Sequence, residues 1–212
     1  MREIEVAVHD VRGSLTIISR QCLTLRRHGG TGIVGTLRLI EREVERAGEV
    51  VDRMVGEHAS RADSTDVGAI VREVVEANSG LAAQRDRHVG MSVEEGLIVV
   101  GRPERLRVAI ENLVQNALRH APVFTAILVR AVRDGEGIVI EVADEGGGVP
   151  TRDRVRIFEV GYRGARPVGR GTGLGLMIAR DVAREHHGAL ELMRTAVGAT
   201  FRLRLPTAEM AE

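Results

Sequence analysis

Two stretches near the start of the chain carry apolar residues at alternating spacings of three and four. The apolar positions of the first stretch are Ile4, Val8, Val11, Leu15, Ile18, Cys22 and Leu25. Those of the second are Leu37, Ile40, Val44, Ala47, Val51 and Met54. This spacing is typical of helices that pack along an apolar seam, and the glycine-rich sequence HGGTG at 28–32 separates the two helices. We therefore predict a helical hairpin over residues 1–62.

The predicted hairpin needs partner helices, because two helices alone bury little of either seam. A second copy of the hairpin would complete a four-helix bundle, so we expect a homodimer. His9 follows Val8 by one position, about 100° around the helix, which places its ring on the accessible flank of that bundle. Cys22 is the only cysteine of the chain, and we interpret it as core packing.

Composition narrows the class of protein and its partners. The 212 residues carry a formal net charge of zero, which gives no support for a nucleic-acid partner or an anionic membrane partner. No run approaches the roughly 18 apolar residues of a membrane span, and MREIEVAVHD lacks the apolar core of a signal peptide. A lone cysteine indicates a reducing compartment. We expect a cytoplasmic chain without nucleic-acid or membrane contact of its own, although a longer parent protein could be membrane-bound.

The apolar pattern changes beyond the polar stretch at 60–66. The sequence AILVRAVRDGEGIVIEVAD at 126–144 predicts two strands around a DGEG turn. GALELM at 188–193 and ATFRLRL at 199–205 predict a final strand pair, and helices fit 67–77, 103–120 and 174–187. We therefore predict an α+β chain, in which the hairpin precedes an α/β sandwich over residues 66–212.

Within that second part, ENLVQNALRH at 111–120 forms one polar, amide-rich helix side. Asn112 and Asn116 are four residues apart, and Arg119 and His120 continue the same side. An amide oxygen is a suitable ligand for Mg²⁺, which usually takes one or two protein ligands and completes its shell with phosphates and water. Taken alone, an ordinary solvated helix face explains the pattern better.

Two glycine-rich stretches follow. In VADEGGGVP at 142–150, Asp144 ends a strand, where a carboxylate can accept a hydrogen bond from an adenine amino group; alone, the stretch is better explained as a plain turn. In GRGTGLGLMIARDVA at 169–183, Gly171, Gly173 and Gly175 stand directly before a helix, whose free N–H groups can bind phosphate. No strand leads into this loop, which excludes a Rossmann fingerprint.

The order of these stretches resembles the catalytic core of two-component sensor histidine kinases. In that family a dimerization and histidine phosphotransfer hairpin precedes an ATP-binding domain of the type shared with gyrase and Hsp90. The resemblance covers nearly the whole chain. It is carried by HDVRGSLT (9–16) at the H box, NLVQNALRH (112–120) at the N box, DEGGGVP (144–150) at the first glycine box, IFEVGYRG (157–164) at the F box and GTGLGL (171–176) at the second glycine box.

The resemblance implies a protein-histidine kinase that phosphorylates its own His9 from ATP and Mg²⁺, then passes the phosphoryl group to an aspartate of a response-regulator receiver domain. It implies that Asp10 orients His9 and takes its proton, that Arg163 acts in the F box, and that Asn116 holds Mg²⁺. The segment 164–170 would be the ATP lid. The implied nucleotide-binding residues are Asn112, Asn116, Arg119, His120, Asp144, Gly146, Gly148, Phe158, Gly171, Thr172, Gly173, Leu174 and Gly175.

Some residues depart from the family pattern. Gly13 and Ser14 replace the usual Thr or Asn and the following Pro, and glycine cannot position a hydrolytic water, so we expect weak phosphatase activity. Glu145 replaces an Asn and adds a negative charge near the expected nucleotide. Two alternatives stay open: a catalytically weak or dead phosphotransfer or scaffold protein of the same family, and a gyrase- or Hsp90-type ATPase. The ATPase would be expected to carry a water-activating Glu in place of Asn112.

Overall fold

The structure is a computed structural model that describes residues 63–135, 137–162, 164 and 173–208. Several predictions lie outside these described residues: the hairpin and its dimer seam, His9, Asp10, Gly13, Cys22, Arg163, Gly171, Thr172 and most of the expected ATP lid. The proposed domain bounds, 1–62 and 66–212, stay a prediction. Everything below concerns the described residues.

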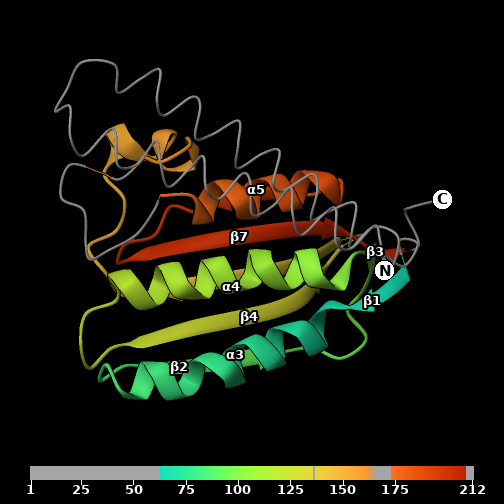
Figure 1. The fold of residues 1–212 in the computed structure, drawn as a ribbon, viewed down its shortest axis with the longest axis horizontal. Coiled ribbons are helices and arrows are strands. Elements are labelled where there is room, and N and C mark those ends of the chain that lie inside the picture. Colours follow the sequence, from blue (N-terminus) through green and yellow to red (C-terminus); the bar gives the residue numbers. More distant parts are fainter. Residues whose placement is uncertain (1–62, 136, 163, 165–172, 209–212) are drawn as a thin grey trace, which may run out of the picture. The chain divides into compact units, whose positions relative to one another are not determined.

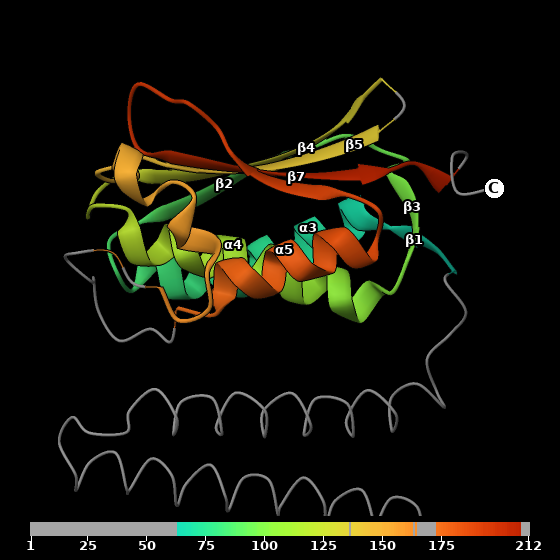
Figure 2. The same cartoon turned by 90° about the horizontal axis from the view of Figure 1, so that it is seen from above.

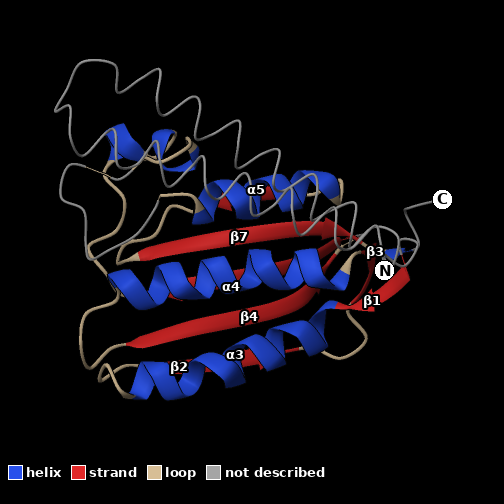
Figure 3. Cartoon of the chain, in the orientation of Figure 1, coloured by secondary structure: helices blue, strands red, loops and turns tan. Residues whose placement is uncertain are grey.

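A five-stranded mixed sheet is covered on one face by a layer of helices (Figures 1 and 2). The strand order is β2 (His88–Val93), β4 (Ala126–Asp134), β5 (Gly137–Asp144), β7 (Ala199–Pro206) and β6 (Ala189–Leu192). Only the β2–β4 pair of this sheet is parallel. The layer opposite contains α3 (Val67–Ala83), α4 (Pro103–His120) and α5 (Gly175–Glu185), and Figure 3 separates the two layers by colour.

Shorter elements complete the described chain. Strands β1 (Asp63–Asp66) and β3 (Ile98–Gly101) form a separate antiparallel pair. Two short 3-10 turns, η1 (Thr151–Asp153) and η2 (Arg156–Phe158), lie between β5 and α5 in the sequence. Within the described residues we find no helix that is long and apolar enough to cross a membrane.

The sequence pattern explains the central elements. Strand β4 alternates exposed and buried residues, and its buried side chains Ile127, Val129 and Ala131 face the core. It pairs antiparallel with β5 across the predicted DGEG turn, with Ala131 opposite Ile140. Helix α4 has the predicted bounds, because Pro103 suits its first turn and an apolar stripe at three- and four-residue spacing is buried along its length. The predicted β4–β5 and β6–β7 pairs and the α+β class are confirmed.

Other bounds differ from the predictions for reasons that involve distant residues. Helix α3 continues six residues beyond the predicted end at Ala77, although Asn78 and Gly80 are poor helix formers. Asn78 is buried, donates to the carbonyl oxygen of Val74 at 2.8 Å, and accepts from Nε2 of Gln115 in α4 at 2.6 Å. Packing against α4 therefore outweighs local preference.

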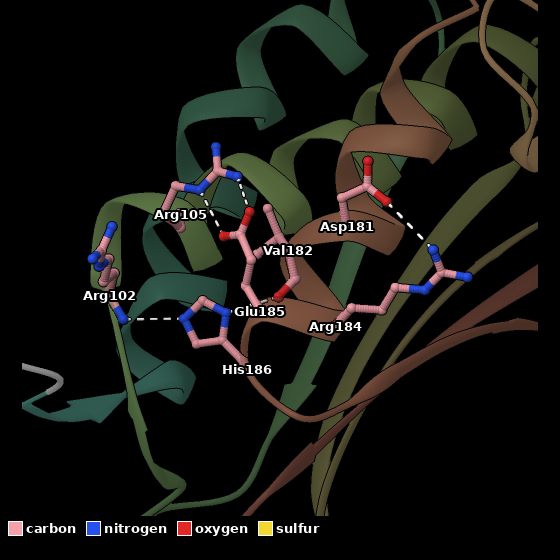
Figure 4. Close-up of polar contacts among 7 residues, drawn as sticks. All are labelled: Arg102, Arg105, Asp181, Val182, Arg184, Glu185 and His186. Carbon is pink, nitrogen blue, oxygen red and sulfur yellow. Dashed lines mark hydrogen bonds and ion pairs between the residues drawn. The ribbon is translucent and has the colours of Figure 1, made fainter. Parts of the chain in front are cut away.

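One end of the α4–α5 pair is joined by side chains, and we call it the closed end (Arg102, Arg105, Glu185, His186 and Gly188; Figure 4 shows the first four). His186 is 6% exposed, accepts from the Arg102 backbone N–H at Nε2 (3.1 Å), and has Nδ1 2.7 Å from the Val182 carbonyl oxygen. These contacts suit an imidazole that carries its proton on Nδ1. Arg105 forms a two-pronged pair with Glu185, with Nε 3.0 Å from Oε2.

Candidate functional site

The opposite end of the α4–α5 pair, which we call the site end (Asn112, Asn116, His120, Asp144, Gly146 and Gly175), contains the polar side of α4. Leu113 and Ala117 are buried in the core, whereas Asn112 and Asn116 are partly exposed. Asn112 Nδ2 donates to the Val108 carbonyl oxygen at 2.9 Å. If Gly175 were replaced by a residue with a Cβ atom, that atom would lie only 2.8 Å from Asn112 Oδ1. The N box and the second glycine box therefore meet at this point.

Asn116 lies one turn further along α4 and is available to a ligand. Its amide makes no hydrogen bond to another described residue. The described residues also contain no cluster of three or more His, Cys, Asp or Glu side chains that could hold a metal ion. The Asn116 amide oxygen could supply one ligand to a cation.

Asp144 ends β5 as a buried carboxylate, 5% exposed. Its Oδ1 accepts from the backbone N–H of Gly146 at 2.8 Å and, more weakly, from that of Ala199 at 3.4 Å. Its Oδ2 makes no hydrogen bond within the described residues. Desolvation by burial raises the pKa of Asp144, and the two backbone bonds and His120 oppose this rise.

His120, the last residue of α4, is coupled electrostatically to Asp144. Desolvation lowers the pKa of His120; the negative charge of Asp144 acts in the opposite direction, and Arg119 lowers it further. The His120 carbonyl oxygen would stand 2.7 Å from a Cβ atom at Gly146, so the first glycine box packs directly on the end of α4. For both residues desolvation is the largest cause of the shift, so the pKa of Asp144 is raised and that of His120 is lowered despite their mutual attraction.

Gly198 belongs to the site, although the sequence did not identify it. Its φ is +66°, and a Cβ atom there would overlap the carbonyl oxygen of Asp144. Gly148, with φ of +67°, would place a Cβ atom 2.9 Å from the Gly198 carbonyl oxygen. These glycines let the start of β7 lie against the end of β5. The available signal was a single glycine directly before the predicted strand at 199–205.

The second glycine box is described from Gly173 onward. Gly173 has φ of +76°, and a Cβ atom there would stand 2.7 Å from the Gly161 carbonyl carbon and 2.8 Å from the Tyr162 carbonyl oxygen. Leu174 is the N-cap of α5, and its carbonyl accepts from the N–H of Ile178 at 2.9 Å. The turn into α5 therefore rests on the backbone of the F box.

Phe158 of the F box is buried in the core. Its ring meets that of Phe201 edge to face at 6.4 Å, and the Arg180 guanidinium of α5 lies 5.6 Å from its centroid. Among the described residues, Arg180 Nε is buried without a hydrogen-bond partner. Phe158 thus joins η2 to α5 and β7.

The Glu145 side chain contacts the start of β4. The residue is exposed, and its Oε1 lies 3.4 Å from the backbone N of Ala126, the first residue of β4. Ala126 lies just beyond the paired residues of β4 and β5. The Glu145 carboxylate therefore accepts from the N–H of Ala126 at a position where a carbonyl of the neighbouring strand would otherwise accept. The Glu145 carboxylate therefore lies beside the first residue of β4.

A hollow of about 270 Å³ adjoins the first glycine box. It is lined by Gly147 to Thr151, Arg154, Leu192, Met193, Thr195, Ala196 and Gly198. Asn112, Asn116 and Asp144 do not line it, so the groups that are available to a nucleotide face elsewhere. We assign no ligand to this hollow.

The chain belongs to the histidine kinase-, DNA gyrase B- and HSP90-like ATPase family, whose model matches residues 101–209. Within this family, its sequence relatives are sensor histidine kinases, which confirms the resemblance drawn from the five motifs. The sensor-like histidine kinase SenX3 of Mycobacterium tuberculosis is 31% identical over 175 residues, which cover 77% of this chain and 43% of SenX3. The sensor histidine kinase CpxA of Escherichia coli is 31% identical over 204 residues, which cover 90% of this chain and 43% of CpxA.

Solved structures agree with this family. The ATP-binding domain of PrrB from Mycobacterium tuberculosis is 27% identical, with a TM-score of 0.57, and the match covers 70% of this chain and 98% of that domain. The mycobacterial sensor histidine kinase MprB shares the fold with a TM-score of 0.60 at 24% identity, covering 69% of this chain and 98% of that chain. The chain spans less than half the length of the curated relatives SenX3 and CpxA.

Proposed function

We propose that this chain is the core of a two-component histidine kinase, which binds Mg·ATP at the site end, phosphorylates His9 and passes the phosphoryl group to a receiver aspartate of a response regulator. The observation that carries the proposal is Asp144. Its carboxylate is buried, Oδ1 accepts two backbone bonds, and Oδ2 has no protein partner among the described residues. Oδ2 reaches the surface, where it can accept a hydrogen bond from a ligand, and an adenine amino group is a suitable donor.

The other residues of the site end fit a nucleotide that extends from Asp144 toward α5. The first N–H groups of a helix have no partner within that helix, so they bind phosphate. Asn112 packs against Gly175 at this helix start and supports the turn. Arg119 and His120 would lie along the nucleotide, and glycines at 146, 148, 173 and 175 would let it approach the backbone closely.

Asn116 is the candidate protein ligand of Mg²⁺, because its amide makes no hydrogen bond to another described residue. Bound there, Mg²⁺ would neutralise phosphate charge. Arg119, from the same helix side, adds a positive charge near the expected phosphates. Helix α4 is rigid, and it holds the side chains of Asn116 and Arg119 in position.

The transfer chemistry follows from the sequence motif at His9. A neutral imidazole nitrogen attacks the γ-phosphorus in line, the N–P bond forms, the bond to the bridging oxygen of ADP breaks, and Asp10 accepts the ring proton. A receiver carboxylate then attacks the same phosphorus and displaces the imidazole. The proposal includes the homodimer, the cytoplasmic location and the weak phosphatase activity expected from Gly13.

Two measurements test this function. Calorimetric titration with Mg·ATP should show binding by the unaltered chain and its loss in Asp144→Ala and Asn116→Ala. Incubation with γ-labelled ATP should give an acid-labile, base-stable phosphate that disappears in His9→Gln, while Mg·ATP affinity stays unchanged in that variant. An acid-stable label would assign the acceptor to Ser or Thr and overturn the kinase assignment.

Nucleotide hydrolysis as the main output is not supported by Asn112. Its Nδ2 donates to the Val108 carbonyl and its Oδ1 packs at Gly175, and an amide cannot take a proton from water. Phosphate release by His9→Gln should therefore stay at the uncatalysed level. Rapid release would favour the ATPase alternative, and absence of any Mg·ATP binding would favour the scaffold alternative.

A further inference from the structure

We infer that Asp153 and Tyr162 form a positioning pair that holds the start of α5 in place for phosphate binding, an inference that rests on the proposed function. Neither residue belongs to the groups that face the expected nucleotide. Both come from the segment with η1 and η2, which Figure 1 draws beside the start of α5. Their effect reaches the site through three successive contacts: a side-chain hydrogen bond, a backbone contact at Gly173, and a contact of Gly175 with the Asn112 side chain.

The first of these contacts is the hydrogen bond between the side chains of Tyr162 and Asp153. The Tyr162 hydroxyl donates to Asp153 Oδ1 at 2.7 Å, and Asp153 is 6% exposed. The Arg156 guanidinium lies 4.4 Å from the centroid of the Tyr162 ring, and Arg152 Nε lies 3.7 Å from Asp153 Oδ1. The tyrosine is thus held both at its hydroxyl and on its ring face, which fixes the backbone of residue 162.

That backbone determines where Gly173 can lie. The Gly161 carbonyl carbon and the Tyr162 carbonyl oxygen would stand 2.7 and 2.8 Å from a Cβ atom at Gly173. No side chain fits between them, so Gly173 follows any shift of residues 161 and 162. Gly173 comes two residues before Gly175, the first residue of α5.

The same turn then meets α4, where Gly175 packs on Asn112 Oδ1. A continuous line of contacts therefore runs from Asp153 through Tyr162, Gly173 and Gly175 to Asn112. The N–H groups at the start of α5 bind phosphate only when they point at it, and a displacement of about 1 Å can cost roughly a hundredfold in rate. The pair acts on the phosphate end of the site, whereas Asp144 acts on the adenine end.

Binding measurements on Tyr162→Phe and Asp153→Asn test the inference. Both variants keep the size of the side chain, so we expect each to fold and to bind Mg·ATP roughly five- to tenfold more weakly. Adenosine, which lacks phosphates, should compete for the site with unchanged affinity. The matched control is Glu185→Gln at the other end of α5, which removes an ion pair and should leave Mg·ATP affinity unchanged.

Tyr162 also provides a direct probe, because the chain has one tyrosine and no tryptophan. The hydrogen bond to Asp153 is the main cause that raises the pKa of Tyr162, and the Asp153 charge adds to it. Ultraviolet absorbance should therefore show phenol ionisation at lower pH in Asp153→Asn than in the unaltered chain. An unchanged titration would mean that the pair does not form in solution.

The outcomes separate the two proposals. If the unaltered chain does not bind Mg·ATP, the proposed function fails. If it binds and Tyr162→Phe binds equally well, the positioning pair fails while the proposed function stands. Equal losses for Mg·ATP and adenosine would also overturn the inference, because a general loss of structure affects both. Should Asp153→Asn fail to fold, Tyr162→Phe decides alone.

Discussion

At the closed end of the α4–α5 pair, His186 has protein contacts at both ring nitrogens and Glu185 is paired with Arg105. At the site end, Asp144 is equally buried, yet one of its carboxylate oxygens lacks a partner among the described residues. The α4–α5 pair therefore has satisfied polar groups at one end, and at the other end it lies beside an available carboxylate oxygen at the end of β5. Stability gained at the closed end can offset the cost of keeping the site end ready for a ligand.

The largest expected effect is at the closed end, where Gly188→Ala should abolish most of the stability. A Cβ atom there would overlap the carbonyl oxygen of Arg204 in β7, so α5 and the sheet would have to separate. We expect a loss of about 4 kcal/mol or more in urea unfolding. Gly147→Ala is the control, because nothing lies within 4 Å of its Cβ position, and it should change stability by less than about 0.5 kcal/mol.

At the site end, Gly173→Ala should affect ligand binding more than stability. The substitution places a methyl group against the F-box backbone at a φ of +76°, which costs about 1 to 3 kcal/mol. Because the turn into α5 must shift, we expect Mg·ATP binding to fall below detection in calorimetry at temperatures where the variant remains folded. Retained affinity would contradict the contact between Gly173 and residues 161–162.

Asp144→Asn tests whether the buried carboxylate at the site end is destabilising at neutral pH. Burial raises the folded-state pKa of Asp144 above its unfolded value, so the folded chain binds this proton more tightly. The contribution to stability is therefore fully present below the unfolded pKa and is lost as pH rises through the folded pKa. At neutral pH, Asp144→Asn should raise the melting temperature and weaken Mg·ATP binding. A lower melting temperature would show that the ionised carboxylate is stabilising.

His187→Gly should strengthen the closed end slightly. His187 follows α5 with a φ of +55°, and its N–H and that of Gly188 bond to the carbonyls of Arg184 and Ala183. This is the Schellman arrangement, whose left-handed position favours glycine. We expect a gain of about 1 kcal/mol in thermal unfolding, with Mg·ATP affinity unchanged. A loss of stability would indicate that the His187 side chain makes contacts that outweigh its backbone strain.

The smallest expected effect is that of Glu185→Gln. The side chains of Arg105 and Glu185 are 32% and 44% exposed, so water and salt screen their attraction. We expect a loss of at most about 1 kcal/mol, which should shrink when unfolding is repeated at high salt. A loss that is independent of salt would assign the contribution to packing instead of charge.

The sequence predicted elements whose signal is local. Helix α4 was predicted with its bounds because Pro103, the apolar stripe and the basic last turn all lie within it. The extension of α3 depends on Gln115, which is 37 residues away from Asn78, and local preference could not show it. Strand β2 has one fully buried position, Val89, so its alternation was too weak to identify.

The residues of the candidate site also divide into those that local sequence predicts and those that depend on contacts between distant residues. The polar side of α4 was foreseen because helix periodicity places Asn112 and Asn116 opposite Leu113 and Ala117. The direction of Glu145 depends on how β4 pairs with β5, and the availability of Asp144 Oδ2 depends on where β7 begins. The contact of Tyr162 with Asp153 requires the fold of η1 and η2, for which the sequence carries no periodic signal.

The glycines of this domain have a consequence for how its relatives diverge. Gly146, Gly173 and Gly198 have protein atoms where a side chain would begin, whether or not a nucleotide is ever bound. A lineage that lost ATP binding would still be selected to keep them, because any replacement unfolds or distorts the domain. Asn116, whose amide makes no hydrogen bond to another described residue, would be free to be substituted. Among degenerate relatives, loss of that asparagine should therefore precede loss of the glycine motifs.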